Sequence, residues 1–193
     1  MKRLVFCAVA GLFLATSCGP PLSVFPLFTE ETLVSAPELI GDWAGDPDVS
    51  LKISQVDGKK TLRASWHEEN ECPAEFEIHA VRLGDRLFWD WTPSEHQSHE
   101  TDNDVLEYHT LPLHSFARVD VEGDRLRVAV MDYDWLTKQI ESGKVKLDHV
   151  MLDGKIPLLT ASTEDLQAFF AENAGNPDAF PEEEEKLEFT RVK

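Results

Sequence analysis

Residues 49–66 read VSLKISQVDGKKTLRASW, and this stretch decides the fold class. Apolar residues alternate with polar ones over 49–53 and again over 62–66, and an Asp-Gly pair stands between the two runs at 57–58. Alternation with a period of two predicts a strand with one buried face, and Asp-Gly is typical of a tight hairpin turn. The stretch therefore predicts an antiparallel β-hairpin.

The same pattern recurs along most of the chain. Further strands are predicted at 76–80, 87–91, 111–121, 126–130, 147–152 and 155–160, with Gly-containing turns between several of them and a closing strand near 187–192. About eight strands joined to their sequence neighbours predict a mainly β protein, either an antiparallel up-and-down barrel or a strongly curled sheet, because closure removes exposed edges.

Two α-helices are expected outside the strands. The first spans about 133–142 and ends at Gly143, with Trp135, Leu136 and Ile140 as its buried stripe. The second begins after Ser162, whose side chain is an N-cap, with Asp165 three residues further on.

The first eighteen residues have the layout of a secretory signal peptide. Lys2 and Arg3 precede an apolar run, small residues follow, and Cys18 ends the segment. The stretch LATSC at 14–18 resembles the lipobox of bacterial lipoproteins. That resemblance implies removal of residues 1–17 and a lipid on Cys18. The alternative is cleavage at a nearby site and a free secreted protein.

The expected organisation therefore has three parts. Residues 1–17 are the signal peptide, residues 18–36 are a lipidated cysteine with an extended, proline-containing tether, and residues 37–193 are a single β-barrel-like domain. By analogy with lipoproteins, Gly19 favours the outer membrane, facing the periplasm, if the host is Gram-negative. The membrane is thus an expected partner through the lipid anchor.

The charge of the chain excludes one class of partner. With 18 basic and 36 acidic residues, its net charge is −18. Loss of Lys2 and Arg3 with the signal peptide would make the chain more acidic still. A strongly acidic surface repels phosphate backbones, so no nucleic-acid partner is expected.

Gly41, Trp43 and Arg191 form a second resemblance. A Gly-x-Trp motif at the start of the first barrel strand, with an arginine in the closing strand, is similar to the signature of the lipocalin and calycin barrels. The resemblance implies that Arg191 stacks on Trp43 and shuts one end of the barrel. The pairing is also sound physically, since a guanidinium group is attracted to an indole face.

Four longer segments resemble a group of uncharacterised bacterial lipoproteins. This resemblance implies a fold and a cellular location but no activity. The segments are LFTEETLV (27–34), GDW (41–43), HSFARVDVEGDRLRVAVMDYDWL (114–136) and LTASTEDLQAFFAENA (159–174).

Apolar and aromatic side chains on the predicted strands are the candidate ligand contacts, because a roomy small barrel often encloses a ligand. The same side chains could instead fill the barrel. They are Trp66, Trp89, Trp91, Leu62 and Leu87. The leading functional hypothesis is a binding module for a small apolar or amphipathic ligand, and the alternative is a solid-core protein that engages another envelope protein.

Catalytic motifs are not found in the sequence, so neither an enzyme nor a cofactor is expected. His96 and His99 lie in an acidic stretch at 94–104 that is expected to be a solvated loop rather than a metal site. His109 and His114 are predicted on opposite faces of one strand, with Arg118 on the face of His114. Cys72 is expected to make no disulfide within the mature chain. It could be a reactive thiol or an intermolecular partner, and a place in a turn or in the core is favoured.

Overall fold

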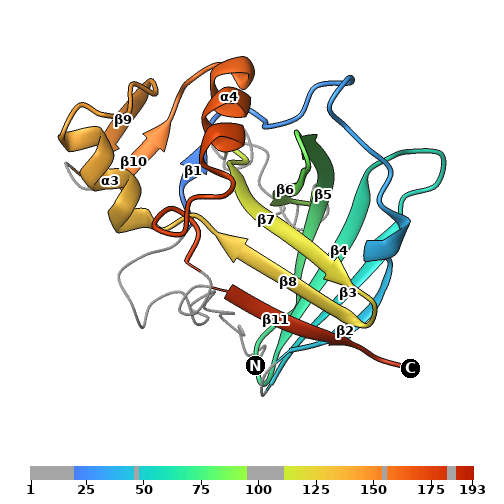
Figure 1. The fold of residues 1–193 in the computed structure, drawn as a ribbon. Coiled ribbons are helices and arrows are strands. Elements are labelled where there is room, and N and C mark those ends of the chain that lie inside the picture. The colour runs from blue at the N-terminus through green and yellow to red at the C-terminus, as the bar shows by residue number, and fades with distance from the viewer. Residues whose placement is uncertain (1–19, 46–47, 95–110, 154–155, 182–185) are drawn as a thin grey trace, which may run out of the picture.

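The computed structural model describes residues 20–45, 48–94, 111–153, 156–181 and 186–193 (Figure 1). Its strands are β1 (Leu22–Ser23), β2 (Gly41–Ala44), β3 (Val49–Gln55), β4 (Leu62–Glu68), β5 (Ala74–Leu83), β6 (Arg86–Pro93), β7 (His114–Glu122), β8 (Arg125–Val130), β9 (His149–Leu152), β10 (Ile156–Leu159) and β11 (Lys186–Arg191). Its helices are the 3₁₀-helix η1 (Pro37–Leu39) and the α-helices α3 (Tyr133–Glu141) and α4 (Thr163–Asn173).

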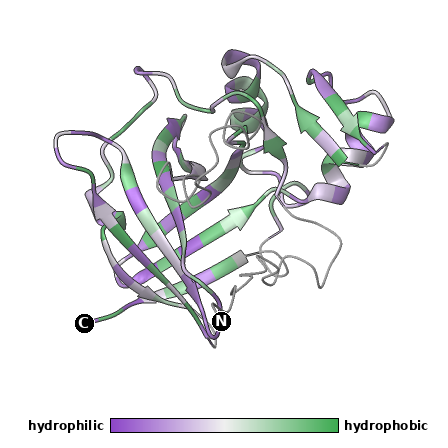
Figure 2. Cartoon of the chain, turned by 180° about the vertical axis from the view of Figure 1, so that it is seen from behind, coloured by the Kyte–Doolittle hydropathy of each residue, from purple (hydrophilic) through white to green (hydrophobic). Residues whose placement is uncertain are grey.

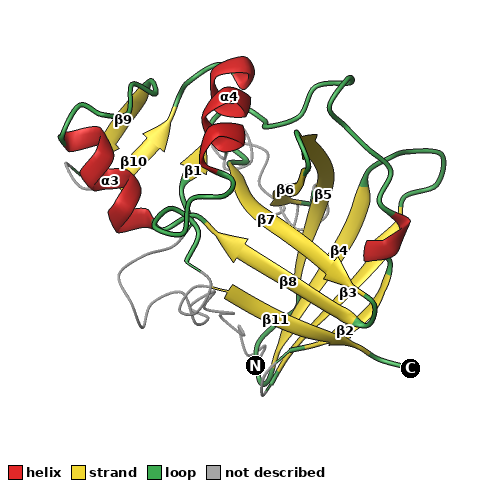
Figure 3. Ribbon diagram, in the orientation of Figure 1, coloured by secondary structure: helices red, strands yellow, loops and turns green. Residues whose placement is uncertain are grey.

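Eight antiparallel strands close into a barrel. They are ordered β6-β5-β4-β3-β2-β11-β8-β7, and pairing between β6 and β7 joins the two ends (Figure 3). The predicted fold class, a mainly β protein with an antiparallel barrel and two α-helices, is confirmed. Closure gives every barrel strand two partners, which removes the exposed edges of an open sheet.

The alternating pattern explains which side chains enter the barrel. Leu51 is paired with Trp66 and Ile53 with Ala64 across β3 and β4. Directly opposite residues of an antiparallel pair share one face, so the apolar members of both strands point the same way. Leu51, Ile53 and Ala64 are buried, whereas Lys52 and Ser54 between them are exposed.

A second core lies outside the barrel, under helix α4. The ring of Phe170 is 5.9 Å from Phe88, 5.1 Å from Phe116 and 6.3 Å from Phe180, centroid to centroid. Phe88 and Phe116 belong to β6 and β7, so the helix covers the outer face of these strands. The predicted cap is confirmed, since the Asp165 backbone N–H donates to Ser162 Oγ at 3.2 Å. No helix of the described residues has the length and apolar composition needed to cross a membrane.

The segment 20–36 is not the extended tether that its prolines suggested. Leu27 and Ala36 are fully or almost fully buried, and Leu33 forms a β-bridge with Val81 of β5. Gln167 of α4 donates to the carbonyl oxygen of Leu27 at 2.8 Å. This segment lies over the outside of the barrel because its apolar side chains complete the second core.

The hairpin of β9 and β10 is not part of the barrel, although its two strands are among the eight that are expected to form it. It forms as predicted, but it lies outside the barrel, where β1 joins it to the start of β7. β8 pairs with β7 only from Ala117 onward, and β1 takes the vacated place beside His114 and Ser115. The eight barrel strands therefore include β2 and β11 instead of β9 and β10.

Candidate functional site

One end of the barrel is closed by Trp43, Arg191 and helix η1. The Arg191 guanidinium carbon lies 4.0 Å from the centroid of the Trp43 ring. Arg191 Nη1 donates to the Ile40 carbonyl at 2.7 Å, and Nη2 donates to that of Glu38 at 2.6 Å. Trp43 Nε1 donates to the carbonyl oxygen of Leu39 at 2.8 Å. The arginine and the tryptophan thus hold η1 across this end.

Gly41 leaves room for this closure. Its φ of +144° lies in a region that glycine adopts readily, and an added Cβ would stand 2.5 Å from Arg191 Nη1. The structure therefore brings Gly41, Trp43 and Arg191 together.

Replacement of Gly41 by alanine is expected to lower the free energy of unfolding by at least about 2 kcal/mol, from backbone strain plus displacement of Arg191. Gly58→Ala is the matched control, because Gly58 also has a positive φ but no atom lies within 4 Å of its added Cβ. It should cost about 1 kcal/mol, from backbone strain alone. Urea unfolding of both variants measures the difference, and equal losses would contradict the steric account.

The five predicted ligand contacts all lie in the barrel cluster. Leu62, Leu87, Trp89 and Trp91 are buried, and Trp66 is partly buried and packed against them. Part of the interior is therefore filled by the protein's own side chains. This packing does not decide between the two alternatives, which are that these side chains contact a ligand or that they fill the barrel.

The three tryptophans belong to one aromatic cluster toward the end of the barrel opposite Trp43. The ring centroids of Trp66 and Trp91 are 6.5 Å apart, and those of Trp89 and Trp91 are 6.3 Å apart. Phe76 lies 5.2 Å from Trp91, and Phe189 lies 5.8 Å from Trp66. These residues come from β4, β5, β6 and β11, so the cluster spans the barrel.

Two indole N–H groups in this cluster have no acceptor among the described residues. Trp89 is 1 % exposed and Trp91 is 6 % exposed, and the Nε1 atom of each is buried without a hydrogen-bond partner. Trp66, by contrast, donates to Glu68 Oε1 at 2.8 Å. A buried donor without an acceptor costs about 1–3 kcal/mol, so each of these two groups is stabilised by an acceptor that the described residues do not supply.

The rest of the barrel cluster sets the character of such a ligand. Among the described residues, the buried polar or charged side chains are Ser23, Asp90, Ser94 and Arg118, and Arg118 is the only cation of the four. Arg118 is bound to the Ala174 carbonyl, so it offers no counter-charge to a negatively charged group inside the barrel, and the chain itself carries a net charge of −18. A neutral molecule with an apolar part and an oxygen acceptor fits this environment better than an anion does.

Polar residues on the outer barrel face make a separate structural cluster. Asp90 is fully buried, and its carboxylate accepts from the Leu27 backbone N–H and pairs with His114 Nδ1, each at 2.6 Å. His79 stacks on Phe28 with ring centroids 4.1 Å apart. Burial lowers the pKa of His79, against the opposing effect of the Asp90 charge. These contacts fix the segment around Leu27 to the barrel.

Arg118 lies on the outer face with His114, not inside the barrel. Its guanidinium group donates to the Ala174 carbonyl at 2.7 Å and lies 5.3 Å from the Phe180 ring centroid. The prediction that His114 and Arg118 share a face is confirmed, and both serve contacts on the outside of the barrel, His114 through Asp90 to the segment around Leu27 and Arg118 to the α4 region.

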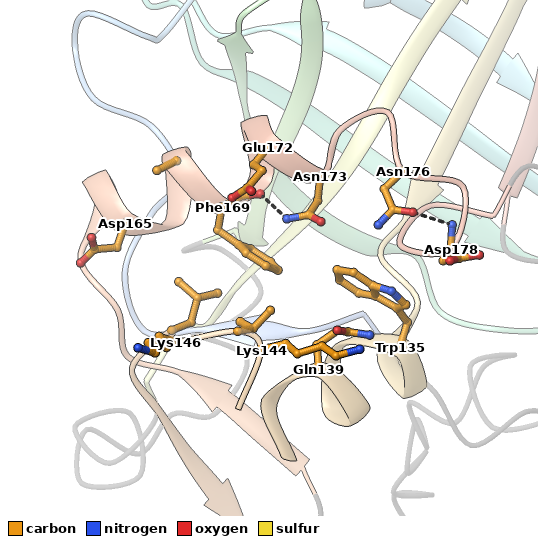
Figure 4. A pocket seen from close by; sticks show the side chains of 13 residues that line it. Trp135, Gln139, Lys144, Lys146, Asp165, Phe169, Glu172, Asn173, Asn176 and Asp178 are labelled. Carbon is orange, nitrogen blue, oxygen red and sulfur yellow. Dashed lines mark hydrogen bonds between the residues drawn. The ribbon is translucent and has the colours of Figure 1, made fainter. Parts of the chain in front are cut away.

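A concave site of 530 Å³ lies between α3 and α4 (Figure 4). Trp135 and Phe169 stack at 6.3 Å beside it, and their rings point into it. Asn173 donates to the Phe169 carbonyl and Asn176 accepts from the Asp178 backbone, so both amides already have partners within the chain. No side chain lining this cavity has a buried polar atom without a partner, which makes the barrel the stronger candidate.

Several sequence expectations fall outside the described residues, namely those on Cys18, His96, His99 and His109. Cys72 is exposed and disulfide-bonded, so the expectation that it makes no disulfide within the chain is wrong. The other cysteines of the chain, Cys7 and Cys18, both precede the described residues. Across the described ranges, no group of three or more His, Cys, Asp or Glu side chains is placed to hold a metal ion.

Sequence reasoning missed Phe76 and Phe189 as members of the aromatic cluster. Both could have been found by parity, since Phe76 alternates with Ile78 on β5 and Phe189 stands two residues before Arg191 on β11. No protein-family model matches the chain, and no significantly similar protein was found among curated proteins or solved structures.

Proposed function

We propose that this chain is a lipid-anchored cell-envelope protein that holds a small, neutral, amphipathic ligand in its barrel. The observation that carries the proposal is the pair of buried indole donors on Trp89 and Trp91, which lack acceptors among the described residues. Oxygen atoms of the ligand would accept from both of them, and the surrounding aromatic rings would contact its apolar part.

The closed end supports the same proposal. Trp43, Arg191 and η1 shut one end, while the aromatic cluster lies toward the other, so a ligand would enter from one side only. This closure strengthens the similarity to lipocalins that Gly41, Trp43 and Arg191 suggested.

The proposed anchor rests on the sequence of residues 1–18. A lipid on Cys18 excludes a disulfide at the same residue. A thioether to lipid and a disulfide to Cys72 both need the sulfur of Cys18. The intact mass of the mature protein distinguishes a Cys18 that carries lipid from a Cys18 that is disulfide-bonded.

Trp91→Phe and Trp89→Phe test the ligand site, because phenylalanine keeps an aromatic ring and removes the N–H donor. Each is expected to weaken binding of monolauroylglycerol about tenfold, the effect of one lost hydrogen bond in a buried site. Isothermal titration calorimetry measures the affinity.

Trp66→Phe is the matched control, since the Trp66 N–H already has Glu68 as acceptor. It replaces an indole of the same cluster by a smaller ring, but the donor that it removes was already bound to Glu68. Its effect on ligand affinity should therefore be clearly smaller. Equal losses in all three variants would show that ring size, not the donors, matters. Absence of binding in the unaltered protein would favour the alternative, a solid-core protein that engages another envelope protein.

A further inference from the structure

An exposed apolar face lies on the β9–β10 hairpin. Val150, Leu152 and Ile156 are 51 %, 38 % and 45 % exposed, although all three are large hydrophobic side chains. We name these three residues the hairpin face. Figure 2 shows hydrophobic residues along these strands. Exposed apolar groups that gather on neighbouring strands indicate a contact surface, whereas scattered ones do not.

The strand register shows which way this face points. Leu152 is paired with Ile156, and Val150 with Leu158, so these residues share one face of the hairpin. Leu159, the next residue, belongs to the opposite face and is buried in the core under α4. The hairpin face is therefore the side turned away from α4.

The same face is continuous with the inner face of the barrel. One row of paired residues crosses five strands, from Trp91 on β6 through Ser115, Leu22 and Leu158 to Val150 on β9. Residues in such a row share a face of the sheet. The hairpin face is thus an extension of the surface that carries Trp91, outside the end of the barrel where the aromatic cluster lies.

The short distance along the chain between Cys18 and β1 suggests what covers the hairpin face, namely the lipid bilayer. Cys18 precedes β1 by only four residues, and four extended residues span at most about 14 Å. Because residues 20–36 are packed on the barrel instead of forming a free tether, an acylated Cys18 would hold β1 and its neighbours close to the bilayer. This step rests on the lipid anchor of the proposed function.

The local charge agrees with that position. Residues 144–153 contain two lysines and two aspartates, whereas the whole chain has twice as many acidic as basic residues. This region is therefore not repelled by anionic lipids in the way that the rest of the acidic chain is.

We propose that the hairpin face lies against the lipid bilayer when Cys18 is acylated. Insertion of its three side chains would remove their exposed apolar area from water, which adds to the attachment given by the acyl chains. The end of the barrel where the aromatic cluster lies would then be oriented toward the bilayer by the row that joins Val150 to Trp91.

Photo-crosslinking tests this orientation in the lipidated, full mature protein. The photoreactive residue p-benzoylphenylalanine is introduced at Val150 or at Ile156, and the protein is reconstituted into vesicles of phosphatidylethanolamine and phosphatidylglycerol. The matched control carries it at Asp57, which is exposed in the turn between β3 and β4 at the closed end of the barrel. The expected result is a phospholipid adduct in the mass spectrum at both hairpin positions and none at Asp57.

The outcomes are distinguishable. An acylated protein that gives no lipid adduct at Val150 and Ile156, or equal adducts at Asp57, overturns the orientation and leaves the anchor intact. An adduct to a protein overturns it in favour of a protein partner. An intact mass without acyl chains overturns the anchor and this inference with it, while ligand binding in the barrel is measured independently.

Discussion

Replacement of Asp90 by alanine is expected to lower the free energy of unfolding by about 2–6 kcal/mol, because two hydrogen-bond donors lose their acceptor at about 1–3 kcal/mol each. The Asp90 side chain is fully buried, and it accepts from both the Leu27 backbone N–H and His114. Its loss leaves a buried donor on Leu27 unsatisfied and detaches the segment 20–36 from β6.

Urea unfolding followed by tryptophan fluorescence measures this loss. Asp90→Asn should cost less than Asp90→Ala, because the amide keeps one oxygen acceptor. Asp85→Ala is the matched control on the same sheet, since the Asp85 side chain is 92 % exposed, and its effect should stay within about 0.5 kcal/mol. An Asp90→Ala variant as stable as the control would show that this cluster does not hold the N-terminal segment.

Replacement of Trp43 by alanine is expected to cost about 3–5 kcal/mol, the typical loss for a large aromatic side chain in a core. Trp43 is fully buried, donates to the Leu39 carbonyl and supports the Arg191 guanidinium group on its ring. Its removal opens a cavity at the closed end and frees η1.

Two further variants separate the contributions at this end. Trp43→Phe keeps a ring for Arg191 but loses the N–H donor, so its cost should be smaller than that of alanine. Arg191→Lys keeps the charge but cannot reach the carbonyls of Glu38 and Ile40 with one planar fork. Urea unfolding measures the stability of Trp43→Ala, Trp43→Phe and Arg191→Lys. A Trp43→Ala variant as stable as the unaltered protein would contradict a closing role for Trp43.

The barrel could be predicted from the sequence because alternation and turn residues act locally. The hairpin of β3 and β4 follows from 49–66, and the cap of α4 follows from Ser162 and Asp165. The contact of Trp43 with Arg191 joins residues from the two ends of the domain, and only the resemblance to a known closure suggested it.

The packing of residues 20–36 could not be predicted in the same way. Three prolines near its start favour extended backbone, but extended backbone is equally suited to a free tether and to a segment packed on a sheet. Leu27 and Phe28 were the missed signal, since their burial depends on partners more than forty residues away. Likewise, alternation predicted the β9–β10 hairpin but not which strand it would join.

The candidate site shows the same limit. The sequence predicted that Trp89 and Trp91 face the interior, because both stand at alternate positions of one strand. It could not show that their N–H groups lack acceptors while Trp66 has one, because that difference depends on Glu68 and on the packing of the whole cluster.

Native mass spectrometry of the mature protein, released gently from the envelope in which it was made, tests the central claim most directly. The denatured mass reports the covalent state of Cys18, and the native mass additionally reports any molecule held in the barrel. The account predicts an added native mass that disappears on denaturation and is reduced in Trp91→Phe. A bare protein mass that stays unchanged after incubation with monolauroylglycerol and with envelope lipid extract would contradict it.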